Sequence, residues 1–317
     1  MTRVSKNISI FGVVLAGAVL AGCGTPAPRT VRYSAPADVH NPATVKHQYT
    51  VLAVDAAGQP LPGVEVALKA TSKGVPDKAS TCVTDVAGRC EPVSLDVVKD
   101  PTYTYVTSYS SSADAKGTKV GYYEAKNKGI IYDSVKKDSA RDIKLRMIQP
   151  VDYLDSSLAN SAADKELRER VLRFLEVIKL QSLLTDSEVM LKGVGTSEFK
   201  SKKYLRLRVN SETVYNSLKL DKYAIGKLLY DETVRKLLNP LNDHIAAPKA
   251  YYGYDIVVYG YTKNLTDKYA TPTKIEYRFL LPEAAVRRYK DKDISGQALL
   301  DAGVILMDDE RVEFKLQ

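Results

Sequence analysis

The sequence predicts a domain of β-strands followed by an α+β domain, in which an antiparallel sheet carries helices on one face. Apolar residues recur at every second position in short runs up to Met147, as in half-buried strands. From residue 152 the apolar spacing changes to three or four, which is typical of amphipathic helices, and later alternates again. The 317 residues suffice for two such domains.

The first 22 residues have the parts of a secretory signal peptide. Arg3 and Lys6 form a basic start, and an apolar run over residues 8–20 follows. That run is too short for a bilayer, which needs roughly 20 apolar residues. The Leu-Ala-Gly-Cys tetrapeptide ending at Cys23 resembles the lipobox of bacterial lipoproteins, which implies cleavage before Cys23 and lipidation of its thiol. A plain signal peptide with a chance cysteine is the alternative.

Residues 23–44 are expected to be an extended linker between the lipid and the folded chain. This segment contains four prolines and few large apolar residues, so it cannot form a core. Gly24 stands where lipoproteins retained in the inner membrane usually have Asp, so the resemblance implies an outer-membrane anchor. His40 and His47 lie near its end, and without acidic or thiol neighbours they predict polar surface rather than a metal site.

Two motifs characterise residues 45–148, the expected first domain. A D-x-x-G-x-P-L-x-G-V-x-V pattern begins at Asp55, and a T-D-x-x-G turn begins at Thr84. Together they resemble the carboxypeptidase regulatory-like domain. That resemblance implies a small transthyretin-like or Ig-like β-sandwich with a non-enzymatic role in packing, spacing or binding.

Three cysteines are present, and lipidation of Cys23 leaves Cys82 and Cys90 as a pair. In an exported protein such a pair predicts a disulfide. The two lie symmetrically about Val86, so a hairpin would place them opposite each other on neighbouring strands. A redox-active pair is the alternative, which the spacing disfavours because it is not Cys-x-x-Cys.

Residues 152–317 are the expected α+β domain, and no family resemblance accompanies them. Leu205 and Leu207 alternate with Arg206 and Arg208, so leucines and arginines occupy opposite faces of one strand. We expect helices near 161–184, 282–289 and 295–302, and one from Asp221 that ends before Pro240. We expect strands near 188–194, 204–209, 253–262 and 273–281, and a terminal hairpin over 304–316.

Tyrosines offer the strongest candidate for a binding surface, because the chain has 21 Tyr but 5 Phe and no Trp. Tyr259 and Tyr261 alternate with Ile256 and Val258, so they line an open sheet face if the aliphatic residues pack under helices. Tyrosine combines apolar area with a hydroxyl. Tyr252, Tyr259 and Tyr261 are therefore the candidate binding face, unless the rings pack against a neighbouring domain or helix.

The remaining motifs do not predict catalysis, a metal or a cofactor. Residues 291–296 resemble the opening of a calcium loop, but Ala302 stands where the closing Glu is needed. The carboxylates at 308–310 would be solvated at a hairpin tip. His244 has no nucleophile placed beside it.

These observations predict a non-catalytic outer-membrane lipoprotein, in which a β-sandwich spacer presents an α+β domain that binds a protein or glycan. An accessory subunit of an envelope-spanning secretion, pilus or polysaccharide-export assembly is the alternative. The formal charge of +8 falls by two when Arg3 and Lys6 leave with the signal peptide. The remaining basic residues form no stripe with stacking aromatics, so we expect no nucleic-acid partner.

Overall fold

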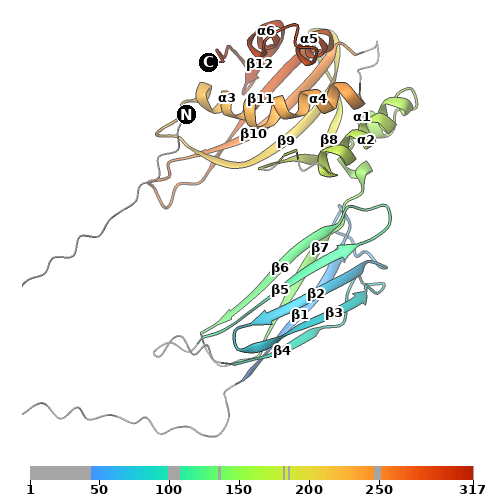
Figure 1. Ribbon diagram of the computed structural model, residues 1–317, viewed down its shortest axis with the longest axis vertical. Coiled ribbons are helices and arrows are strands. Elements are labelled where there is room, and N and C mark those ends of the chain that lie inside the picture. The colour runs from blue at the N-terminus through green and yellow to red at the C-terminus, as the bar shows by residue number, and fades with distance from the viewer. Residues whose placement is uncertain are drawn as a thin grey trace, which may run out of the picture. The chain divides into compact units, whose positions relative to one another are not determined.

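The computed structural model (Figure 1) describes residues 44–98, 108–134, 137–180, 183–184, 186–245 and 251–316. The predicted signal peptide, Cys23 and nearly all of the linker lie outside these residues. Strands predominate over helices in the part that is described, and they form three sheets. None of the helices in this part is long and apolar enough to cross a membrane.

Seven strands form the N-terminal part. They are β1 (Val45–Val54), β2 (Glu65–Ser72), β3 (Val75–Val83), β4 (Val93–Val97), β5 (Tyr109–Thr118), β6 (Ala125–Asp133) and β7 (Ser139–Arg146). One sheet has the order β4-β1-β7 and the other β3-β2-β5-β6. β1 and β7 run parallel, whereas the other pairs are antiparallel. Tyr49 of β1, Leu68 of β2 and Leu145 of β7 are buried in one cluster, so the two sheets pack against each other.

Thr84 joins the two turn motifs of this part. Its Oγ1 donates to the carbonyl of Leu61 (2.8 Å) and accepts the N–H of Val64 (3.0 Å). Gly88 has a φ of 71°, and a Cβ at that position would lie 2.4 Å from the carbonyl oxygen of Ala53. Both the backbone angle and the close approach therefore require glycine there.

Cys82 and Cys90 pair as the sequence predicts, with sulfur atoms within bonding distance and Cα atoms 6.0 Å apart. The predicted hairpin, however, is wrong. Cys82 of β3 lies opposite Val66 of β2, whereas the N–H of Cys90 donates to the carbonyl of Val51 in β1. The turn between the cysteines carries the chain from one sheet to the other, so the disulfide joins the two sheets.

His47 is fully buried, contrary to the expectation that it lies on the surface. Alternation in β1 starts at Val45, further toward the N-terminus than the sequence indicates, and this places the imidazole inside. Its Nδ1 lies 2.7 Å from the hydroxyl of Ser111, and its Nε2 lies 3.4 Å from a carboxylate oxygen of Asp133. Burial lowers the pKa of His47 and outweighs the attraction of Asp133, which raises it.

A six-stranded mixed sheet and its helices form the C-terminal part. The strands are β8 (Ser187–Phe199), β9 (Lys202–Asn216), β10 (Gly253–Lys263), β11 (Thr273–Pro282), β12 (Val304–Met307) and β13 (Glu310–Val312). The helices are η1 (Pro150–Tyr153), α1 (Ser156–Ala159), α2 (Lys165–Leu180), α3 (Lys222–Leu229), the π-helical turn η2 (Tyr230–Val234), α4 (Arg235–His244), α5 (Glu283–Lys290) and α6 (Gly296–Ala302).

The sheet has the order β13-β12-β11-β10-β9-β8. The predicted antiparallel sheet is wrong at one pair, because β9 and β10 run parallel while the other neighbours are antiparallel. The run of α3, η2 and α4 connects these two strands and returns the chain to the end where β9 began. A connection through helices is the usual route between parallel strands.

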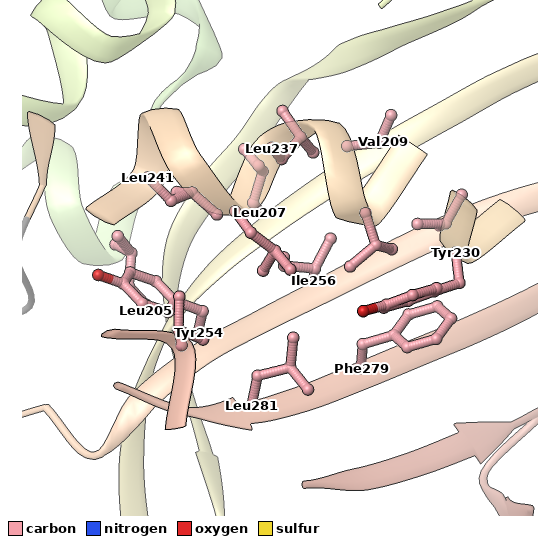
Figure 2. Packing of buried hydrophobic residues seen from close by; sticks show 14 of the residues in the cluster. Leu205, Leu207, Val209, Tyr230, Leu237, Leu241, Tyr254, Ile256, Phe279 and Leu281 are labelled. Atoms are coloured by element: carbon pink, nitrogen blue, oxygen red, sulfur yellow. The ribbon is translucent and has the colours of Figure 1, made fainter. Parts of the chain in front are cut away.

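Helices α1 to α6 all pack on one face of this sheet, as the sequence predicts. Leu207 of β9, Ile256 of β10 and Phe279 of β11 point from the sheet into the main cluster. Leu237 and Leu241 of α4 meet them from the helical side (Figure 2). Each large side chain buried in this way contributes roughly 1.5–3 kcal/mol.

The second helical run continues through Pro240 to the end of α4, so the prediction that it ends before this proline is wrong. Proline inside a helix lacks an N–H donor and costs about 3 kcal/mol. Leu237, Leu238 and Leu241 surround it and are all buried. Their burial outweighs the local cost of the proline.

Candidate binding face of the C-terminal sheet

The sheet surface opposite the helices, which we call the open face, carries charged and aromatic side chains. Alternation places Asp255 of β10 beside Arg206 of β9, and Val257 between Arg208 and Arg278. Further along, Tyr259 lies between Asn210 and Glu276. Its residues on the three central strands include the buried Tyr204 and Leu280 together with Arg206, Arg208, Asn210, Asp255, Val257, Tyr259, Tyr261, Lys274, Glu276 and Arg278.

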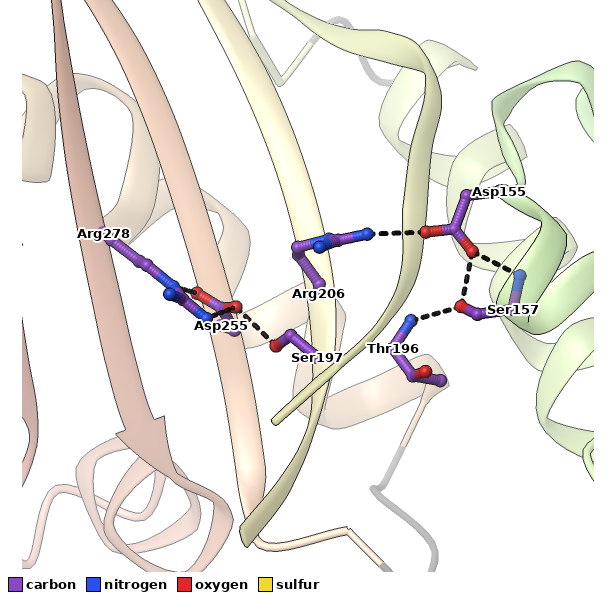
Figure 3. Close-up of polar contacts among 7 residues, drawn as sticks. All are labelled: Asp155, Ser157, Thr196, Ser197, Arg206, Asp255 and Arg278. Carbon is purple, nitrogen blue, oxygen red and sulfur yellow. Dashed lines mark hydrogen bonds and ion pairs between the residues drawn. The ribbon is translucent and has the colours of Figure 1, made fainter. Parts of the chain in front are cut away.

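Asp255 is the fully buried centre of one polar network on this face (Figure 3). Arg278 donates to both carboxylate oxygens, from Nε at 2.8 Å and from Nη2 at 2.7 Å. The Ser197 hydroxyl donates to the same carboxylate at 2.5 Å. The hydrogen bond to Asp255 raises the pKa of Arg278. This two-pronged pairing holds both side chains in place, so neither is available to a ligand.

A second network holds Arg206 (Figure 3). Its Nη2 donates at 2.7 Å to Asp155, which also accepts the N–H of Ser157 at the start of α1. The Ser157 hydroxyl in turn accepts the N–H of Thr196 at 2.8 Å. A Cβ on Gly195 would lie 1.9 Å from the Asp155 carboxylate. Glycine there gives the carboxylate room beside β8.

Arg208 differs from the other two arginines because it has no carboxylate partner among the described residues. It is half-buried, and its Nε, like that of Arg206, is buried without a hydrogen-bond partner. Burial raises the pKa of the neighbouring Tyr259, and Glu276 adds to this effect, whereas the positive charge of Arg208 opposes it. Buried polar atoms nearly always have a partner. Arg208 is therefore the best candidate on this face to contact an anionic ligand.

The predicted tyrosines occupy different environments. Tyr259 is only 9% exposed, and the Lys274 ammonium lies 3.5 Å from the centroid of its ring. Tyr261 is half-buried and donates its hydroxyl to Asn210 at 2.9 Å. Tyr252 precedes β10 and is 42% exposed. Alternation thus places Tyr259 and Tyr261 on the open face, but their rings are not free platforms.

The charged residues of this face were only partly visible in the sequence. Alternation placed Arg206 and Arg208 opposite the leucines of β9, but no sequence pattern linked them to Asp255 or Tyr259. The signal that could have linked them is the shared period of two in β9, β10 and β11.

The other acidic patterns have local structural roles. The Ser295 hydroxyl accepts the N–H of Ala298 and caps α6, where the sequence resembles a calcium loop. Asp308 accepts the N–H of Glu276 next to the β12–β13 turn. Within the described ranges, no group of three His, Cys, Asp or Glu residues is arranged to hold a metal ion.

No protein-family model and no curated protein matches this sequence. Among solved structures, the chain is similar to 3-chlorocatechol 1,2-dioxygenase from Rhodococcus opacus 1CP, with 11% identity and a TM-score of 0.25 over 33% of this chain and 60% of that one. It is also similar to chlorocatechol 1,2-dioxygenase from Pseudomonas putida, with 11% identity and a TM-score of 0.23 over 33% and 61%. A C-terminal fragment of the pilus adhesin SpaC from Lactobacillus rhamnosus GG shows 13% identity and a TM-score of 0.16 over 33% and 44%. The chain spans about 60% of the length of the two dioxygenases, and TM-scores this low carry no argument about function.

Proposed function

We propose that this protein is a non-catalytic lipoprotein of the outer membrane whose C-terminal part binds an acidic protein or glycan through the open face. The observation that carries the proposal is the position of Arg208. Its side chain is half-buried on the sheet face opposite the main helical core, its Nε has no hydrogen-bond partner, and no carboxylate pairs with it in the described part. A carboxylate or phosphate of a partner would supply the missing acceptor. Arginine and tyrosine are also the residues enriched at binding hot spots.

Lipid on Cys23 would anchor the chain, and the two packed sheets of the N-terminal part would act as a spacer. The roles of Thr84 and Gly88 in joining the turns support the carboxypeptidase regulatory-like interpretation, because they explain why both motifs occur together. A Cys23→Ser variant is expected to leave the membrane fraction. Retention of that variant would contradict the anchor.

A cluster of Ser111, His47 and Asp133 in the N-terminal part has the residue types of a catalytic triad. Its burial supports a structural role instead. His47 is fully buried, Ser111 is 5% exposed, and the Ser111 hydroxyl is also 2.6 Å from the hydroxyl of Tyr49. A substrate carbonyl has no route to this serine, so we interpret the cluster as a hydrogen-bond network that links β1, β5 and β6.

Crosslinking of the intact protein in its own cells tests the binding proposal. Arg208→Gln removes the charge on the open face, and Lys236→Gln removes one from the exposed side of α4 as a matched control. We expect a captured partner to be lost with Arg208→Gln and retained with Lys236→Gln. Equal capture by both variants would rule out the open face. A stoichiometric envelope protein in the captured fraction would favour the assembly subunit, whereas a glycan would favour a stand-alone binding module.

A further inference from the structure

We infer that a cleft in the helical layer of the C-terminal part is a second binding site, which takes an acidic sugar. The cleft has a volume of about 760 Å³ and is bounded by α3, η2 and the start of α6. Small-molecule sites typically measure roughly 300–1,000 Å³. The cleft lies on the helical side of the sheet, away from the open face, so this inference does not depend on the function proposed for Arg208.

Tyr230, which lines the cleft, supplies the first indication of a ligand. The residue is fully buried, and its hydroxyl has no hydrogen-bond partner in the described part of the chain. The hydroxyl lies next to Gly296, where a Cβ would be 3.7 Å away. By contrast, the buried hydroxyl of Tyr277 donates to the carbonyl of Lys222 at 2.6 Å. An unpaired hydroxyl at a cleft is explained if a ligand supplies its partner.

Tyr230 is also the first residue of the π-helical turn η2, which interrupts the run between α3 and α4. Such turns are rare and occur frequently at functional sites. Gly296 opens the cleft on the other side, because a Cβ there would approach Leu316 to 3.3 Å and the ring of Tyr289 to 3.8 Å. The missing side chain at Gly296 leaves room next to the buried Tyr230 hydroxyl that a larger residue would fill.

The charged residues that line the cleft favour an acidic ligand over a neutral one. Arg235 pairs with Asp231 at 3.1 Å, and Asp221 accepts the N–H of Ala224 at the start of α3. Lys227 is half-buried and is the cleft cation that has no acidic partner among the described residues. Its ammonium group is therefore available to a carboxylate of the ligand.

The rest of the lining favours a sugar ring over an aliphatic chain. The rings of Tyr223 and Tyr289, together with leucine side chains, can pack against the C–H face of a pyranose. The Tyr230 hydroxyl can bond to a sugar hydroxyl, whereas an aliphatic acid would leave it without a partner. A neutral sugar would leave Lys227 unpaired. A pyranose that carries one carboxylate would provide a partner for both the Tyr230 hydroxyl and the Lys227 ammonium group.

Calorimetric titration of the mature chain with Cys23→Ser tests this inference. The probes are glucuronate, galacturonate and N-acetylneuraminate, with glucose and hexanoate as controls. We expect at least one sugar acid to bind saturably and at least tenfold more tightly than glucose and hexanoate. The inference would be overturned if none of the three sugar acids bound, or if hexanoate bound as tightly as the sugar acids. If trigalacturonate binds more tightly than galacturonate, the natural ligand is part of a glycan. Equal affinities indicate that the natural ligand is the free sugar acid.

Variants place the binding in the cleft. Lys227→Gln is expected to lower the affinity for the sugar acid at least tenfold, to a value near the affinity for glucose. Tyr230→Phe is expected to lower the affinity for the sugar acid severalfold. The melting temperature of the free protein should not fall, because the hydroxyl has no hydrogen bond to lose. Lys236→Gln, on the exposed side of α4, should leave the affinity unchanged. Full affinity in both Lys227→Gln and Tyr230→Phe would refute the site.

Substitution at Gly296 provides a test of the space itself. Gly296→Ala adds a Cβ that meets only ordinary contacts and the flexible end of Leu316, so binding should persist. Gly296→Val extends further into the cleft and should abolish binding while the circular dichroism spectrum stays unchanged. Undiminished binding in a folded Gly296→Val variant would contradict the proposed location.

Discussion

Replacing Asp255 with asparagine is expected to destabilise the C-terminal part by about 3–5 kcal/mol, the usual cost of removing one member of a buried ion pair. The size follows from the surroundings of this side chain. Asp255 is fully buried and accepts three hydrogen bonds, two from Arg278 and one from Ser197. Arg278 is 20% exposed and would keep its charge without the counter-ion. Asparagine retains one acceptor, so we expect a value near the lower limit.

Removing both charges should cost far less than removing one. Asp255→Leu combined with Arg278→Met eliminates the unpaired guanidinium and fills similar space with apolar atoms. We expect this double variant to be within about 1–2 kcal/mol of the parent, because apolar replacement of a buried pair is often neutral. The difference between the double variant and the two single ones measures the coupling between the side chains.

Native-state hydrogen exchange read by mass spectrometry separates the two parts of the chain. Peptides from β10 and β11 should lose protection in Asp255→Asn, whereas peptides from β1 and β2 provide an internal control. A loss below about 1 kcal/mol would show that the network does not hold the sheet face. A double variant as unstable as Asp255→Leu alone would show that the unpaired arginine is not the cause.

Three further changes test other features. Because burial lowers the pKa of His47 below its ordinary 6.5, the unfolded chain takes up this proton first as pH falls. The N-terminal part should therefore lose stability below about pH 6.5 in melts between pH 7.5 and 5, and His47→Gln should flatten that dependence. Replacing Cys82 and Cys90 with alanine should lower the free energy of unfolding in urea by ~2–3 kcal/mol. If reduction of the parent protein lowers it by the same amount, the loss is due to the disulfide bond itself. Gly195→Ala should displace Asp155 and lower stability by about 1–3 kcal/mol; an unchanged melting temperature would contradict the observed crowding.

Local alternation predicted much of the C-terminal sheet. The leucines of β9 and the aliphatic residues of β10 repeat every second position, so the sequence showed both the strands and which side chains share a face. It therefore placed Arg206, Arg208, Tyr259 and Tyr261 on the face opposite the core. Capping residues similarly marked the starts of α3 and α6.

Contacts between distant residues could not be predicted in this way. Arg206 and Asp155 are 51 positions apart, and their pairing depends on how α1 packs against β8. The parallel pairing of β9 with β10 depends on the path of α3, η2 and α4, which no local pattern specifies. The spacing of Cys82 and Cys90 was compatible with a hairpin, but the intervening turn packs against β1 instead, where the carbonyl of Gly88 accepts the N–H of Ala53.

The parallel pairing of β1 with β7 has a mechanical consequence for the N-terminal part. The chain enters this part at β1 and leaves it at β7, and the two strands are paired in register from His47 with Ser139 to Val54 with Arg146. Tension applied between residues 45 and 146 therefore acts along the strands in opposite directions. Such a load shears the whole ladder of hydrogen bonds at once instead of peeling it open one bond at a time. The strands that carry the chain in and out are thus arranged to resist stretching.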